Sequence, residues 1–143
     1  MIELIPLCTV LVDVEPSLAV GAGPAGSRSI GVISAATVKG ERMNGSLAGP
    51  AAADWAVIAG AIGTIDVRMT IRTDDGALIY VTYGGRLDLS NPAQGITAYV
   101  APLFETGDER YKWLNKIQGA GKGKLMLKAG GAAQLEYEFY EIR

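Results

Sequence analysis

Two strand-like segments on either side of an Asp-Asp-Gly turn constrain the fold more than any other feature of the chain. Residues 64–72 alternate between polar and apolar side chains, so every second residue lies on the same face of a strand. One face carries Asp66, Arg68, Thr70 and Arg72, and the other carries Val67, Met69 and Ile71. The turn Asp74-Asp75-Gly76 favours a hairpin because glycine adopts positive φ at low cost. The sequence therefore predicts that residues 78–83 return as an antiparallel partner strand.

Other strand-like segments follow along the chain, separated by glycine, proline and asparagine turn signals. We expect these strands over residues 2–14, 29–39, 95–102, 125–127 and 134–142. The 19 glycines are spread along the chain, which indicates many turns and bulges rather than a linker. The run AAADWAVIAGAI at residues 51–62 is compatible with a short helix or an irregular strand.

One helix is predicted among these strands. Thr106 and Glu109 have the spacing of a capping box, in which each residue bonds the backbone of the other. Gly119 is a suitable terminator, so the predicted helix covers residues 107–117. Many evenly spaced strands with one short helix indicate an all-β protein. We expect a single domain over residues 1–143, folded as an antiparallel β-barrel of about eight or more strands.

Composition excludes several classes of function. The net charge of −2 argues against a general nucleic-acid binder, since such proteins are usually basic. The absence of histidine removes histidine metal sites and Ser-His or Cys-His catalytic pairs. The single cysteine, Cys8, lies in an apolar run and is expected to be a buried, inert thiol. We therefore expect chemistry without a metal or a cofactor.

The sequence also carries no targeting signal that we recognise. No apolar run reaches the length of a membrane span, so no membrane partner is expected. The first residues include Glu3 and Asp13 and lack the basic region of a secretory signal. The expected location is the cytoplasm, with a small molecule as the partner and a homodimer as an open alternative to a monomer.

The first candidate for chemistry is Asp54, which stands beside Trp55 in an otherwise apolar run. Burial there would raise the pKa of the carboxyl group and make it a usable acid or base near neutral pH. The simpler alternative is a turn or capping aspartate beside a core tryptophan.

The second candidate is the polar strand face that contains Arg68. If this face lined a polar barrel interior, Arg68 would bind a carboxylate, enolate or carbonyl oxygen, and Tyr83 on the partner strand would add a phenol donor. In a solvated sheet the same face is simply the wet surface. Sequence alone does not fix which face points inward.

The third candidate is the aromatic-rich segment FETGDERYKWLN at residues 104–115. Tyr111 and Asn115 are four residues apart and would share one face of the predicted helix. A pocket at the barrel mouth would be covered by this segment, and its apolar walls would come from Trp55, Phe104, Tyr111 and Trp113. Core anchoring is the alternative role for the aromatic residues, and a buried asparagine needs either a backbone or a ligand partner.

Three blocks of sequence carry a resemblance to a known family. They are ADW at residues 53–55, DVRMTIRTDDGALIYVTYGG from Asp66, and APLFETGDERYKWLN from Ala101. In order and spacing these blocks resemble the domain-of-unknown-function family number 3237, which consists of small bacterial and fungal β-barrel proteins. The resemblance implies a compact barrel and pocket roles for residues in the three blocks. These residues are Asp54, Trp55, Arg68, Tyr83, Tyr111, Trp113 and Asn115.

Two functional hypotheses follow. The first is a cofactor-independent enzyme of the isomerase, cyclase, lyase or hydratase type, acting on a small carbonyl, phenolic or polyketide-like substrate. In this hypothesis Asp54 moves the proton, while Arg68, Tyr83 and Asn115 hold the developing oxyanion. The second is a barrel that binds or carries a small molecule without chemistry. An enzyme needs a carboxylate whose ionisation governs turnover, whereas a carrier needs only the apolar walls of a binding pocket.

Overall fold

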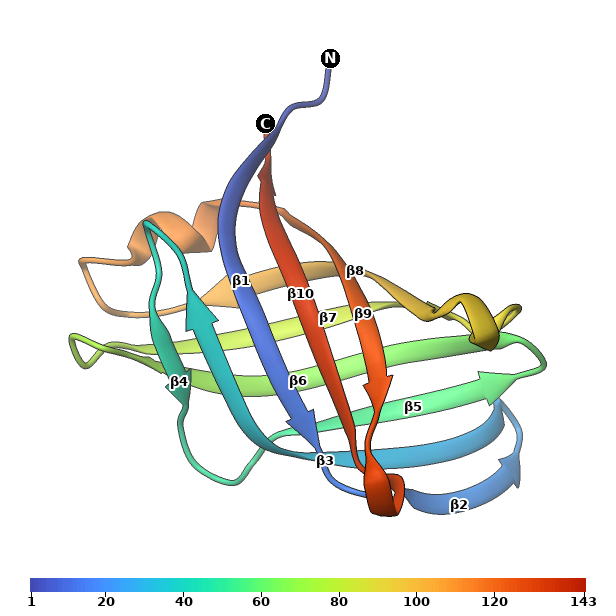
Figure 1. Cartoon of the computed structure of the whole chain (residues 1–143). Coiled ribbons are helices and arrows are strands. Elements are labelled where there is room, and N and C mark those ends of the chain that lie inside the picture. The colour runs from blue at the N-terminus through green and yellow to red at the C-terminus, as the bar shows by residue number, and fades with distance from the viewer.

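The predicted hairpin is the longest pairing in the structure, a computed structural model that describes residues 1–143 (Figure 1). Strand β6 (Ile62–Thr73) and strand β7 (Leu78–Asp88) pair in antiparallel register from Ile62↔Asp88 to Arg72↔Leu78. The Thr73 hydroxyl accepts a hydrogen bond from the Ala77 amide at 2.8 Å and donates to the Asp75 carboxylate at 2.6 Å. These bonds hold the turn in which Gly76 adopts a φ of 94°.

The remaining elements are also strands, joined by short turns and three short 3-10 helices. The strands are β1 (Leu4–Val14), β2 (Leu18–Gly23), β3 (Gly26–Lys39), β4 (Gly45–Leu47), β5 (Ala53–Ala59), β8 (Ile96–Glu105), β9 (Gly119–Leu127) and β10 (Ala133–Ile142). The 3-10 helices are η1 (Pro92–Gln94), η2 (Lys112–Lys116) and η3 (Ala129–Gly131). The run at residues 51–62, which the sequence leaves open, forms strand β5 and its turn into β6.

Strand β1 closes the sheet into a barrel because it pairs with β10 on one side and with β3 on the other. Eight antiparallel strands form the closed barrel, and two additional strands extend it, which confirms the predicted fold class. The short strand β4 and the longer β5 lie one after the other between β3 and β6. This arrangement places the inward-facing residues of β5 at one end of the barrel only.

The interior is densely filled at the end beside η2. The fully buried side chains there come from strands, from the loop between β3 and β4, and from η2, and include Leu7, Met43, Ile71, Ile79 and Leu114. Two glycines of β9 make room for large rings on β10. A Cβ atom on Gly123 would lie 2.5 Å from the Tyr137 ring, and one on Gly121 would lie 2.8 Å from the Phe139 ring. Both positions therefore require glycine as long as the rings stay in place.

The helix expected over residues 107–117 is shorter in the structure, where only Lys112–Lys116 is helical and the helix is of the 3-10 type. The predicted capping box does not form. The Thr106 hydroxyl instead donates to the Leu78 carbonyl at 2.7 Å and accepts from the Asp108 amide at 3.1 Å, and Glu109 pairs with Lys112. Residues 106–111 therefore form a loop that is tied to the start of β7.

Candidate functional site

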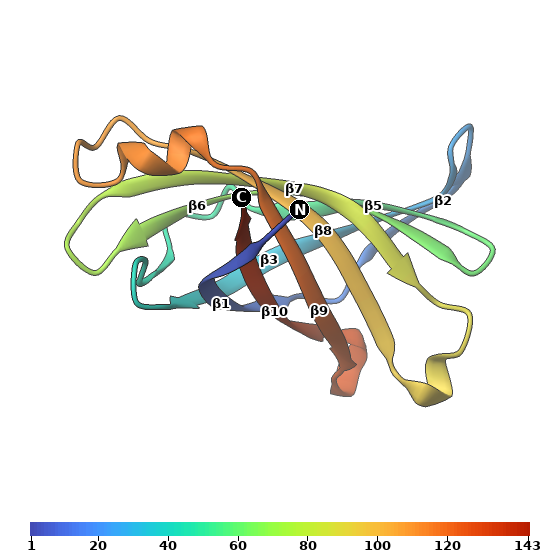
Figure 2. The same cartoon turned by 90° about the horizontal axis from the view of Figure 1, so that it is seen from above.

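A cavity of about 330 Å³ opens at the end of the barrel opposite η2. Strand β6 shows this arrangement, since Gly63 lines the cavity while the turn after Thr73 contacts the η2 segment through Asp75. In Figure 2 the η2 segment lies along the β6–β7 hairpin, whereas the turns at the other end of the barrel diverge from one another. All eight barrel strands contribute to the cavity wall. Most of this wall is aliphatic, and its largest side chains are Ile58, Ile65, Leu87, Leu89, Ile96, Leu125, Leu127 and Leu135.

Asp54 is the only ionisable residue that lines this cavity. It faces inward from β5 because it pairs with Gly31 of β3 and Val67 of β6, whose side-chain positions also face the interior. Its Oδ1 atom accepts a hydrogen bond from the Asp66 amide at 2.9 Å. Burial raises the pKa of Asp54, and the nearby charge of Asp66 adds to this effect, while the hydrogen bond opposes it. The carboxyl group thus lies in an apolar cavity with its pKa raised above that of a solvated aspartate.

Two buried phenols lie in the interior near Asp54. The rings of Tyr83 and Tyr137 have centroids 5.4 Å apart in an edge-to-face arrangement. Burial raises the pKa of both phenols, and the negative charge of Asp54 adds to the increase in each. Both therefore remain protonated and act as neutral hydrogen-bond donors at physiological pH. The sequence prediction named Tyr83 but missed Tyr137, although the alternation in residues 134–142 places Tyr137 and Phe139 on one face.

Arg68 and Trp55 lie on the outer surface of the barrel, so the hypothesis that Arg68 faces the pocket is wrong. The Arg68 guanidinium stacks on the Trp55 ring, with Cζ 4.3 Å from the ring centroid. Arg68 pairs with Ala53 and Thr82, and its neighbours Val67 and Met69 face the core. The polar face of β6 is therefore the solvated one. Trp55 covers the outer face of β5, whereas the preceding residue, Asp54, faces the interior.

Because Arg68 lies outside, its removal should not weaken ligand binding. The Arg68→Met variant loses one exposed cation–π contact, so we expect a decrease in the free energy of unfolding of about 0.5–1 kcal/mol. The affinity of any ligand that binds in the cavity should stay at the wild-type value. Calorimetric titration and chemical denaturation of the two proteins check both expectations. A large loss of affinity for an anionic or enolisable ligand would contradict the outward placement of Arg68.

The aromatic-rich segment also does not line this cavity. Phe104 is buried in the core, while Tyr111 and Trp113 pack against it from the loop and from η2. The Asn115 side chain accepts from the Thr106 amide at 2.8 Å and donates to the Thr106 carbonyl at 2.9 Å, so its partner is backbone. The predicted pocket beneath this segment is thus replaced by a structural plug, centred on the fully buried Leu114.

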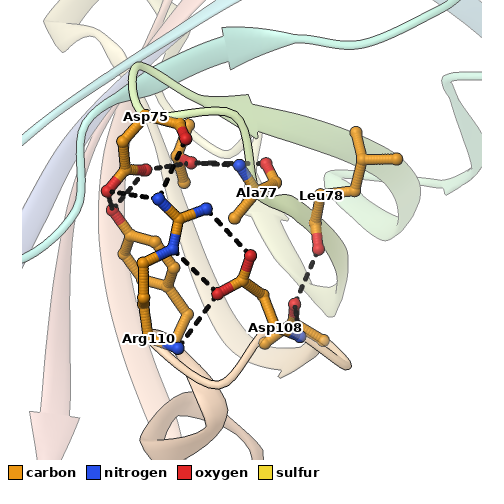
Figure 3. Close-up of polar contacts among 8 residues, drawn as sticks. Asp75, Ala77, Leu78, Asp108 and Arg110 are labelled. Atoms are coloured by element: carbon orange, nitrogen blue, oxygen red, sulfur yellow. Dashed lines mark hydrogen bonds and ion pairs between the residues drawn. The ribbon is translucent and has the colours of Figure 1, made fainter.

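A polar network fastens this plug to the β6–β7 turn (Figure 3). The Arg110 guanidinium donates two bonds to the Asp108 carboxylate, at 2.9 and 3.0 Å, and one to the Asp75 carbonyl at 3.0 Å. The Tyr111 hydroxyl donates to the Asp75 carboxylate at 2.9 Å. The bonds from Arg110 lower the pKa of Asp108 to about 2. The charged residues of the segment therefore have a structural role, which is to hold the plug to the β6–β7 turn.

The raised pKa of Asp54 predicts a measurable pH dependence of stability. Between the unfolded pKa near 3.8 and the higher folded value, the folded state keeps a proton that the unfolded state has released. The resulting penalty is absent below about pH 3.8 and complete above the folded pKa. Asp54→Asn removes the penalty, so its advantage over wild type should grow as pH rises through this window. Denaturation of both proteins across this range checks the trend, and an advantage that does not change with pH would contradict it.

The structure contains no group of three or more histidine, cysteine, aspartate or glutamate side chains placed to hold a metal ion. None of its helices is long and apolar enough to span a membrane. Cys8 is buried, and burial raises the pKa of its thiol to about 12. Asp54 is therefore the one residue with a shifted pKa that opens into the apolar cavity.

Comparison with known sequences assigns the chain to a family. The sequence model of the family described as "Protein of unknown function (DUF3237)" matches residues 2–142. The chain belongs to DUF3237. The resemblance noted in the three sequence blocks is thereby confirmed over essentially the whole length.

Solved structures with a similar fold come from several organisms. A β-barrel-like protein of Acinetobacter baumannii is 30% identical, with a TM-score of 0.83 over 100% of this chain and 97% of that chain. A protein of unknown function from Clostridium acetobutylicum is 21% identical, with a TM-score of 0.85 over the full length of both chains. An enzyme from Penicillium herquei is 22% identical, with a TM-score of 0.68 over 99% of this chain and 94% of that chain.

One curated relative of this DUF3237 chain has a named activity. It is the hydroalkoxylation enzyme phnH of Penicillium herquei, which is 41% identical over 64 residues. The match covers 43% of this chain and only 36% of the length of the enzyme. Hydroalkoxylation is the addition of the O–H bond of an alcohol across a carbon–carbon double bond, which forms an ether.

Proposed function

We propose that this protein is a cofactor-independent enzyme that adds the O–H bond of a hydroxyl group on a small phenolic or polyketide-like substrate across a double bond in the same molecule. The reaction closes a ring and is therefore of the cyclase type. It takes place in the aliphatic cavity, with Asp54 as the group that transfers the proton. The relationship to a hydroalkoxylation enzyme supports the class of reaction.

The observation that carries this proposal is the isolation of one carboxyl group in an aliphatic cavity. No lysine or arginine lines the cavity to fix Asp54 as a salt bridge, and its only hydrogen bond comes from the Asp66 amide. A structural carboxylate is normally paired or well solvated, since an isolated buried charge is costly. The raised pKa of Asp54 keeps a larger fraction in the acid form, which is the form needed to protonate a substrate.

The proposed step balances without an oxidant or a reductant. The carboxylic acid of Asp54 gives its proton to one carbon of the double bond, and the substrate hydroxyl oxygen forms a bond to the other carbon. The proton of that hydroxyl then returns to the Asp54 carboxylate. Product and substrate are isomers, and the enzyme ends in its starting protonation state. The aliphatic walls exclude water, which would otherwise capture the electron-deficient carbon.

Tyr83 and Tyr137 lie in the buried interior beyond the cavity wall. Their raised pKa values keep both phenols neutral, so they act as donors and not as competing bases. Neither phenol lines the cavity, so we assign neither of them a contact with the substrate, and the oxyanion role that the sequence hypothesis gave to Arg68, Tyr83 and Asn115 has no counterpart in this proposal. Asn115 takes no part because its amide is bonded to the Thr106 backbone.

Incubation of the purified protein with phenols that bear an unsaturated side chain tests the proposal. We expect a cyclic ether of unchanged mass, formed faster than in buffer and with one stereoisomer in excess. Chromatography on a chiral phase detects the product, and an unfolded sample of the protein is the control. Retention of unchanged phenol on the protein, without product, would favour the alternative that the barrel is a carrier. Neither retention nor product across the panel would reject both hypotheses.

A further inference from the structure

The wall of the cavity is mostly aliphatic, and this limits what the cavity can hold. None of the residues that line it is aromatic, so the cavity offers no flat ring for stacking. None is a lysine or arginine, so no cation is available to hold a phosphate or carboxylate group. The polar residues other than Asp54 are the hydroxyl-bearing Ser17, Ser29 and Thr64. Recognition in this cavity thus relies on aliphatic contact and on one carboxyl group.

Several inward-facing aliphatic side chains at this end remain in contact with water. Leu127 is 74% exposed and Ile58 is 38% exposed, although both line the cavity. At the opposite end, the inward-facing Ile71 and Ile79 are fully buried. Apolar surface that a barrel keeps wet at its mouth gains free energy when a ligand covers it. The exposed aliphatic mouth therefore favours a ligand whose outer part is a hydrocarbon chain.

The inner end of the ligand meets Asp54. At a pH above the pKa of Asp54 its side chain is mostly a carboxylate, and an anionic group at that position would face it with no intervening cation and with little water to screen the repulsion. A neutral hydroxyl avoids this repulsion and can donate a hydrogen bond to the carboxylate oxygen that does not bond the Asp66 amide. The site is thus selective for charge as well as for shape.

We propose that the cavity takes a neutral, hydroxyl-bearing ligand with an aliphatic chain, and that Asp54 rejects ligands with a carboxylate or phosphate at the inner end. This inference deepens the proposed function, because it names the substrate class of the same site. The hydroxyl lies next to Asp54, and the chain extends past Leu125 and Leu127 to the mouth. The cavity volume of about 330 Å³ lies at the small end of the range for ligand sites, roughly 300–1,000 Å³.

A matched set of ligands tests the charge selectivity in the absence of turnover. The set consists of 4-hexylphenol, 4-hexylbenzoate and 4-hexylbenzylamine, which share the ring and chain and differ at the inner end. By calorimetry at pH 7.5 we expect the phenol to bind at least about ten times more tightly than the benzoate. In Asp54→Asn this preference should largely disappear, and in the wild type it should weaken as pH falls through the pKa of Asp54.

A chain-length series tests the aliphatic part. From butyl to octyl, each added methylene should tighten binding of the phenol roughly fourfold, as expected for burial of one methylene. Leu127→Ser should reduce this gain, whereas Leu103→Ser, which alters a half-exposed leucine outside the cavity, should not. Equal binding of benzoate and phenol, weaker binding of the amine than of the benzoate, no dependence on chain length, or no binding at all would overturn the inference.

These binding tests can fail or succeed independently of the turnover test of the proposed function. None of the three ligands has a double bond in its chain, so none can undergo the proposed reaction. If charge and chain selectivity hold but unsaturated phenols are not converted, the ligand class stands and the catalytic proposal fails. If unsaturated phenols are converted while carboxylates bind equally well, the catalytic proposal stands and the ligand class fails.

Discussion

Replacement of Asp54 by asparagine should reduce turnover by about 10²–10⁴-fold, the usual contribution of a positioned acid or base. Asparagine has nearly the same shape and can still accept the hydrogen bond from the Asp66 amide, but it cannot donate a proton to carbon. Its fold should be at least as stable as the wild type, since a desolvated carboxyl group is removed. Steady-state kinetics with an unsaturated phenol and thermal unfolding measure the two effects.

The matched control for this variant is Asp66→Asn. Asp66 is the adjacent carboxylate, one strand away, but its side chain lies on the outer surface of β6. Turnover should change little in this control, because only the weak influence of its charge on Asp54 is lost. Equal losses of activity in both variants would show that the effect is general. Wild-type turnover in Asp54→Asn would remove Asp54 from the mechanism.

Replacement of Leu114 by alanine should lower the free energy of unfolding by about 2–5 kcal/mol, as for other fully buried leucines. Leu114 belongs to η2 and fills the end of the barrel opposite the cavity. Because its side chain is fully buried, truncation to alanine removes buried apolar contacts. Activity per folded molecule should stay close to the wild-type value, because the plug does not touch the ligand. Chemical denaturation and kinetics at a temperature at which the variant is folded check both expectations.

The control for the plug is Leu103→Ala. Leu103 is 49% exposed on the outer face of β8, so its truncation should cost well under 1 kcal/mol. The result that contradicts this role of the η2 segment is a Leu114→Ala variant that keeps its stability but loses ligand affinity. That outcome would indicate that residues 104–115 cover a ligand pocket, as the sequence analysis expected.

The sequence was sufficient to predict the barrel, because its signals are local. The alternation in residues 64–72 and the turn at residues 74–76 specify both the strand type and the pairing partner, independent of the rest of the chain. Strand β5 was ambiguous since its Ala-rich run has no clear period. Its conformation is set by pairing with β3 and β6, and such long-range contacts leave no mark on local propensity.

The position of the site was harder to predict, because alternation defines two faces without saying which one a ligand sees. Asp54 and Trp55 are neighbours in sequence and therefore point to opposite sides of β5. The sequence paired them as one unit, but only the carboxyl group lines the cavity. The same ambiguity affected Arg68. Its face of β6 is exposed to solvent, because the side chains on the other face of the strand fill the core.

The aromatic segment at residues 104–115 misled the prediction for a different reason. A plug that seals one end of a barrel and a lid that covers a pocket need the same residue types, large apolar side chains beside polar ones. The distinction depends on which barrel end is filled, which follows from side chains far away in sequence, such as Met43 and Ile79. Tyr137 escaped notice because its proximity to Tyr83 depends on strands that are not adjacent in the sheet.

Deuterium incorporation tests the central claim, that Asp54 delivers a proton inside the aliphatic cavity, more directly than any other measurement. An unsaturated phenol is converted in D2O, where the carboxyl group of Asp54 exchanges its proton for deuterium. The product should carry one deuterium on one carbon of the former double bond, on a single face, as resolved by NMR. Deuterium on both faces in equal amounts, or the same labelled product at the same rate from Asp54→Asn, would contradict the claim.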